Sequence, residues 1–152
     1  MKLAEALLLR AEYQKKLANL YSRIMANLKV QENESPNENP DELLKESFAV
    51  NDQLNALIKQ INARNNEVKL PSGQSISDAL ADRESLMKKR NLLAEIAANA
   101  SMKDFRLTHA EIKMHVTLPI AEIQKQVDDL SRRFRELDAQ IQALNWTVDL
   151  EG

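Results

Sequence analysis

Two histidines and a glutamate are the residues in this chain best suited to holding a metal ion. His109, Glu111 and His115 alternate with apolar residues, so an extended strand would point all three to one side. Imidazole nitrogens and carboxylates are ligands for zinc and similar ions. The histidines are six residues apart, about 20 Å along a strand, which is too far for one ion. Only His109 and Glu111 could share a site, with further ligands from elsewhere. We expect a solvated strand face, and no cofactor.

Two basic clusters could contact phosphate groups, Lys88-Lys89-Arg90 and Arg132-Arg133-Phe134-Arg135. Glu84, Asp128 and Asp129 each stand four positions before a basic residue, which is typical of ion pairs on a helix surface. The formal net charge of −2 also lacks the basic excess of most nucleic-acid-binding domains. Solvated helix faces therefore explain the clusters better than a nucleic-acid site. The residues of that weaker alternative are Lys88, Lys89, Arg132, Arg133 and Arg135.

No set of catalytic residues can be assembled from the sequence. The absence of cysteine excludes disulfides, thiolate metal sites and cysteine nucleophiles. Two glycines cannot supply a glycine-rich phosphate loop. We therefore do not expect an enzyme.

The elements that would position these residues are long helices. Apolar residues recur every three or four positions over residues 2–29, 40–67, 75–101 and 118–145. The sequence predicts a mainly α protein of one domain, residues 1–152, with long antiparallel helices in a coiled-coil-like hairpin or four-helix bundle. An acidic segment with one proline, residues 30–39, is expected to form a mobile loop.

The last helix has the most regular apolar seam, a row of residues spaced alternately by three and four. Such an uninterrupted seam, with a tryptophan after it, favours contact with a second copy of the chain. The predicted interface comprises Val127, Leu130, Phe134, Leu137, Ile141, Leu144, Trp146, Ile112 and Met114.

Polar residues interrupt or border the other seams. Arg10, Arg83 and Arg90 lie in or next to them, and a buried arginine needs a carboxylate or carbonyl partner. Asparagines, poor helix formers, line one side of the second helix at positions 51, 55, 62 and 65. They indicate a half-exposed edge or buried pairs that fix the register between helices; a polar ligand groove is the alternative. We expect Arg10, Arg83, Arg90, Asn55 and Asn62 to form a polar layer.

Residues 108–118 alternate between polar and apolar side chains, which predicts a β-strand or hairpin. A lone strand leaves its backbone hydrogen bonds unmade. The partner would be residues 68–70 or the same strand of another subunit, and we favour pairing between subunits.

Several stretches along the chain are similar to a family of small bacterial proteins often labelled septicolysin. They are Met1-Lys2-Leu3-Ala4-Glu5-Ala6-Leu7, Arg10-Ala11, Gln14-Lys15-Lys16, Asp78-Ala79-Leu80-Ala81-x-Arg83, Glu111-Ile112-Lys113 and Gln142-Ala143-Leu144-Asn145-Trp146-Thr147. The resemblance implies a helical, self-associating bacterial protein with no assigned reaction.

Three functional hypotheses follow. The first is a structural or interaction protein that forms homo-oligomers, dimers or higher. The second is an RNA-binding helical arm similar in outline to that of seryl-tRNA synthetase, and the third is a metal-binding protein using residues 109–115. No apolar stretch approaches the roughly 20 residues of a membrane span, so we expect a cytoplasmic protein with no membrane partner.

Overall fold

The structure is a computed structural model that describes residues 1–102 and 113–152. These residues form four α-helices: α1 (Leu3–Ala26), α2 (Pro40–Glu67), α3 (Ile76–Ala100) and α4 (Ile120–Thr147). The mainly helical prediction is confirmed. The chain divides into two compact units, Met1–Ser75 with Gln142–Gly152 and Ile76–Ile141, and the single domain stays a prediction. Helix α4 contributes residues to both units.

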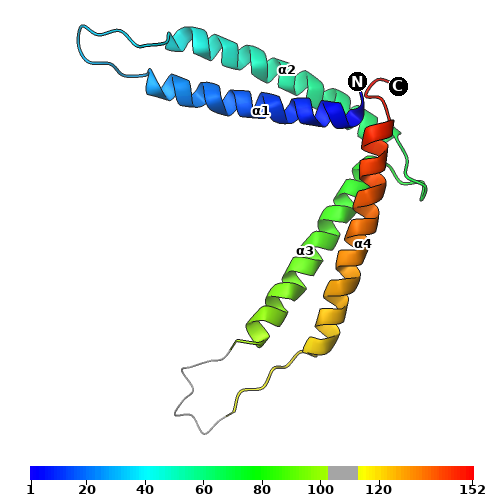
Figure 1. Ribbon diagram of the computed structural model, residues 1–152. Helices are drawn as coiled ribbons and strands as arrows, with labels where there is room; N and C mark the ends of the chain where they lie inside the picture. Colours follow the sequence, from blue (N-terminus) through cyan, green and yellow to red (C-terminus); the bar gives the residue numbers. More distant parts are fainter. Residues whose placement is uncertain (103–112) are drawn as a thin grey trace. The chain divides into compact units, whose positions relative to one another are not determined.

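In the first unit, α1 and α2 lie side by side and run in opposite directions (Figure 1). The loop that joins them is tied to α1, because the Asn27 side chain accepts a hydrogen bond from the Glu38 backbone and Arg23 pairs with the Glu38 carboxylate. Asn39 then caps α2 by accepting from the Asp41 backbone at 3.0 Å, and Pro40 takes the first helical position.

The interface between α1 and α2 is the predicted pair of apolar seams. Leu20, Leu43 and Val50 form a buried cluster against which Tyr13, Leu17 and Ile24 pack. Every seam position of α1 and α2 is buried or half-buried. These positions are Leu3, Ala6, Arg10, Tyr13, Leu17, Leu20 and Ile24 of α1, and Leu43, Ser47, Val50, Leu54, Leu57 and Ile61 of α2.

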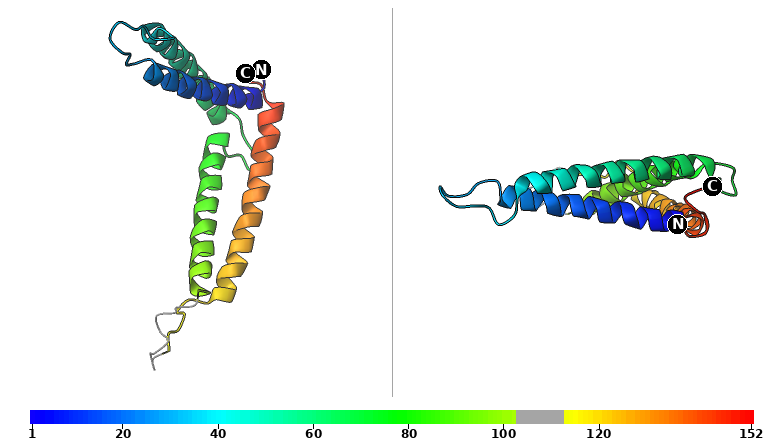
Figure 2. Two further views of the ribbon diagram at one scale, coloured as in Figure 1. Left: turned by 60° about the vertical axis from the view of Figure 1, so that its left-hand side comes forward. Right: turned by 90° about the horizontal axis from the view of Figure 1, so that it is seen from above.

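The two ends of the chain meet in the first unit, as Figure 2 shows. The Leu3 backbone donates to the Val148 carbonyl and the Leu150 backbone to the Met1 carbonyl, both at 2.9 Å. An ion pair of 2.9 Å between Lys2 and Asp149 lies beside them. A similar pairing closes the turn after α2, where Leu70 donates to the Gln74 carbonyl at 2.9 Å.

In the second unit, α3 and α4 also run side by side in opposite directions. Arg83 near the start of α3 pairs with Asp138 at 2.6 Å, and Arg90 farther along donates to Ser131 at 3.4 Å. Residues near the start of α3 therefore lie opposite later residues of α4, and residues farther along α3 lie opposite earlier ones.

The first and second halves of the chain repeat one pattern. Residues 61–70 and 141–150 share Ile, Ala, Asn, Val and Leu at the same five positions, and their burial is identical at every position. Helices α2 and α4 both have 28 residues. The start of α1, with Ala6, Leu7, Arg10 and Lys15-Lys16, likewise matches Ala79, Leu80, Arg83 and Lys88-Lys89 of α3. The chain thus contains the same helical hairpin twice.

The predicted strand is wrong over the residues that can be compared. Residues 113–118 form neither strand nor helix, and residues 108–112 lie outside the described part of the chain. Residues 68–70 do not need that partner, since Lys69 forms an isolated bridge with Ser75. Alternation of polar and apolar residues produces a strand only where a neighbouring backbone offers hydrogen bonds.

Candidate interaction surface

The register of the α1–α2 hairpin decides which exposed residues share a side. Lys16 and Glu46 each come immediately before a seam residue, and their side chains form an ion pair of 3.2 Å. Positions before the seam therefore lie on one side of the hairpin for both helices. Both helices are right-handed, and they run in opposite directions. Positions immediately after the seam in the two helices therefore lie together on the other side of the hairpin.

The side formed by positions after the seam carries no charged residue, and we call it the uncharged face. Its aromatic residues Tyr21 and Phe48 are both 64% exposed, and Met25 and Leu44 beside them are also exposed. A patch of exposed large apolar residues of this kind usually marks an interaction site. The uncharged face comprises Leu7, Ala11, Gln14, Ala18, Tyr21 and Met25 of α1, and Leu44, Phe48, Asn51, Asn55, Ile58 and Asn62 of α2.

The second hairpin provides an internal comparison for this face. Its equivalent positions include four charged residues, Glu84, Asp128, Arg135 and Asp138. Asp128 takes the place of Phe48, and Ala94 the place of Tyr21. The hairpin fold itself therefore does not require an uncharged side.

The second hairpin has a shallow apolar groove on the side opposite to the one that is equivalent to the uncharged face. The residues that line its central part include Leu92, which is 59% exposed, and the charged side chains Lys89, Asp129 and Arg133. This groove differs from the uncharged face because charges of both signs border its apolar floor.

Most of the other ion pairs lie on exposed surfaces. Hydrogen bonds from Arg23 lower the pKa of the Glu38 carboxyl below its usual range. A hydrogen bond from Lys2 lowers the pKa of the Asp149 carboxyl in the same way. Both pairs join segments distant in sequence, and both therefore fix loop or terminal structure.

A family model described as "Family of unknown function (DUF6847)" matches residues 10–150. The chain belongs to this family. It is also similar to a functionally unknown conserved protein from Corynebacterium diphtheriae. That protein's crystal structure matches with 36% sequence identity, covers 97% of each chain and has a TM-score of 0.91. A search of curated proteins gave no match. Neither comparison assigns a function.

These comparisons correct the resemblance to the septicolysin family. The matching family is a different one, and nothing in it or in the structural relative links the chain to septicolysin. The short motifs on which the resemblance depended are largely helix-forming residues such as Ala, Leu, Lys and Glu, which recur in unrelated long helices.

The seam of α4 is partly covered within the chain, and its contact with a second copy stays a prediction. Leu130 and Ile141 are buried, at 8% and 1% exposure, and the seam residues between and beside them are half-buried. Trp146 and Met114 are exposed, at 58% and 74%. Ile112 lies outside the described residues. The half-buried residues are Val127, Phe134, Leu137 and Leu144.

The residues of the predicted polar layer come from both hairpins, and their arrangement as a single layer stays a prediction. Arg83 and Arg90 bind Asp138 and Ser131 within the second hairpin, whereas Arg10 is half-buried in the first. Asn55 and Asn62 are exposed on the uncharged face. Asn65, by contrast, is buried with only 8% exposure.

The basic clusters are largely engaged in ion pairs. Lys88 pairs with Glu84 at 3.2 Å, Arg132 with Asp129 at 2.6 Å and with Glu136 at 3.2 Å, and Arg133 approaches Asp129 at 3.9 Å. Residues 76–141 contain eleven basic and eleven acidic residues. Of the five candidates, Lys89 and Arg135 have no acidic partner within the described ranges.

The metal hypothesis gains no support from the described residues. His115 is exposed, and His109 and Glu111 lie outside the described part of the chain. Among residues 1–102 and 113–152 no group of three metal-binding side chains occurs. None of the helices described is long and apolar enough to cross a membrane.

The sequence reasoning missed two signals that lead to the uncharged face. One is the repeat of about 80 residues, visible in the matched residues 61–70 and 141–150. The other is the complete lack of charge at the positions that follow the seam in α1 and α2, in a chain with 29% charged residues. Asn51, Asn55 and Asn62 of the asparagine row on the second helix are part of that face.

Proposed function

We propose that this protein is a cytoplasmic, non-catalytic interaction protein that associates with itself through the uncharged face of the α1–α2 hairpin. The observation that carries the proposal is a side of two long helices on which Tyr21, Met25, Leu44 and Phe48 are exposed and no charge occurs. Charged residues are depleted at the centres of protein interfaces, and aromatic residues and methionine are enriched there.

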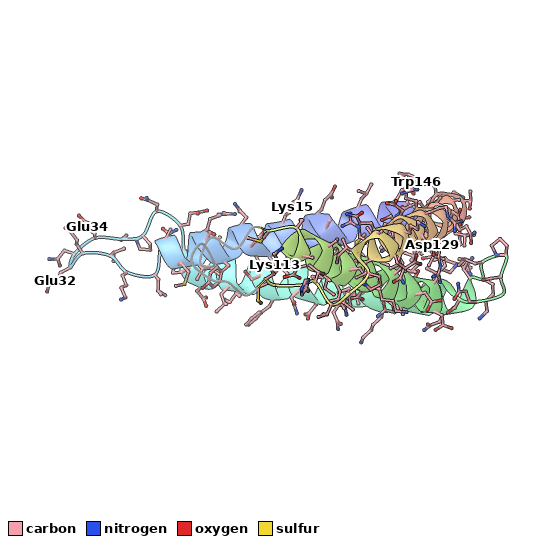
Figure 3. All side chains as sticks on the ribbon, turned by 90° about the horizontal axis from the view of Figure 1, so that it is seen from below. Lys15, Glu32, Glu34, Lys113, Asp129 and Trp146 are labelled. Atoms are coloured by element: carbon pink, nitrogen blue, oxygen red, sulfur yellow. The ribbon has the colours of Figure 1, made fainter. Side chains whose placement is uncertain are left out.

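The two sides of the α1–α2 hairpin differ in their content of charged residues, as a protein interface differs from a solvent-exposed surface. Positions before the seam include Glu5, Glu12, Lys16, Glu42 and Glu46, and one pair of them forms a surface ion pair. Figure 3 shows Glu32 and Glu34 at the tip of the connecting loop, directed away from α1 and α2. Charge is thus abundant around the hairpin and missing from one side alone.

Size-exclusion chromatography with light scattering tests the proposal. We expect the wild-type protein to form a discrete oligomer and Phe48→Asp to be monomeric with unchanged helicity. Leu92→Asp is the matched control, because Leu92 is similarly exposed on a helix of the other hairpin. A wild-type monomer across the micromolar range, or a Phe48→Asp variant that keeps the wild-type mass, would refute the proposal.

A further inference from the structure

The proposed self-association leaves open which surface of the second copy covers the uncharged face. We infer that the same face of the second copy covers it, about a two-fold axis, so that the two α1–α2 hairpins together form a four-helix bundle. This inference rests on the proposed function.

The chemistry of the face makes it complementary to itself. An asparagine side chain has both a carbonyl acceptor and an NH₂ donor, so it can pair with a copy of itself, as a lysine or a glutamate cannot. Asn51, Asn55 and Asn62 form a row along α2, beside the apolar residues of α1. In a two-fold interface, when one residue contacts a second residue of the partner copy, the second residue also contacts the first residue of that copy. Because the uncharged face carries no charged residue, no like charges oppose one another in this pairing.

The other exposed apolar surface described above is a poor partner for this face. The groove of the second hairpin carries Lys89, Asp129 and Arg133 along its edges. Covering it with the uncharged face would remove these charges from water without supplying new partners, which is unfavourable. Pairing of two uncharged faces has no such cost.

The asparagine side chains buried in this interface would also fix the register of the two hairpins. Exposed apolar side chains, Tyr21, Met25, Leu44 and Phe48, lie toward the loop end of the hairpin. The asparagine row begins where this apolar cluster ends. Asparagine pairs at such positions select one register and one number of helices over others, as they do in coiled coils.

Single-cysteine cross-linking tests the two-fold arrangement, because the natural chain contains no cysteine. Ala18→Cys and Asn51→Cys lie near the middle of the face, and at least one should form a disulfide with its own copy under mild oxidation. Asn91→Cys, at the position of α3 equivalent to Ala18, is the control and should remain reduced. A head-to-tail interface brings no residue to its own copy, so absence of self-cross-linking in an oligomeric protein overturns the inference.

Mixing two charge variants gives an independent test. Phe48→Asp and Phe48→Lys should each lose dimer affinity by at least about 30-fold, the effect of removing a strong interface residue. Mixed in equal amounts, they should restore a dimer, because opposite charges then meet across the axis. Failure of either the mixture or the cross-linking, with a dimeric wild type, refutes the two-fold pairing but leaves self-association standing. A monomeric wild type refutes both.

Discussion

Leu20 and Tyr21 are neighbours in the sequence, and we expect opposite consequences from replacing each with alanine. Leu20 is fully buried in the α1–α2 cluster, whereas Tyr21 is 64% exposed on the uncharged face. Leu20→Ala removes three carbons from the core, worth about 2.4 kcal/mol of transfer free energy at about 0.8 kcal/mol each. The cavity left behind raises the expected loss of unfolding free energy to about 3–5 kcal/mol.

Tyr21→Ala leaves no cavity in the hairpin, so its effect on the unfolding free energy should stay within about 0.5 kcal/mol. Its effect should appear instead as weaker association. The assay is urea unfolding followed by circular dichroism over a series of protein concentrations, extrapolated to the dilute limit. Equal losses for both variants in that limit, or a larger loss for Tyr21→Ala, would refute the register on which the uncharged face depends.

Two further predictions concern the loop and the turn of the first unit. The pKa of Glu38 is lowered in the folded protein by hydrogen bonds from Arg23, so its stabilising effect is present above the ordinary carboxyl range and is lost as pH falls through the folded-state pKa. Glu38→Gln should therefore destabilise the protein at pH 7 in urea unfolding, with a smaller difference at pH 3; an equal difference at both pH values contradicts this. Gly73 has a φ of 90° with open space around its Cβ position, so Gly73→Ala should cost about 1–2 kcal/mol from backbone strain alone. Thermal unfolding measures that cost, with Ser72→Ala as the control, and an unchanged melting temperature for Gly73→Ala would contradict the turn geometry.

The helices and their seams were predictable because they depend on local spacing. Predicted and observed bounds differ by three residues or fewer at each end, and both bounds of α2 agree with the prediction. An apolar residue every three or four positions leaves a helix no other way to bury its side chains. Residues 113–118 were predicted wrongly, since a strand requires a partner that the local pattern does not specify.

The candidate surface could be predicted only in part. The asparagine row and the apolar seams were visible in the sequence, and so was the repeat of the helical hairpin. The regularity of the α4 seam, however, favoured contact with a second copy and did not show which of its side chains the chain itself covers. Leu130 and Ile141 are buried within the chain, and a side chain already covered in this way has no surface left to offer.

By itself, the sequence determined the mainly helical class, the four helices of the described residues, the seams and the lack of charge at certain positions. The tertiary structure alone decided which helices pair, and hence that the uncharged positions of α1 and α2 lie on one side of one hairpin. The Lys16–Glu46 ion pair fixes this, since it shows which sides of the two helices coincide. The physical reason is that helix periodicity is a local property of the chain. The alignment of two helices is set by side chains that are distant in the sequence and meet only on folding.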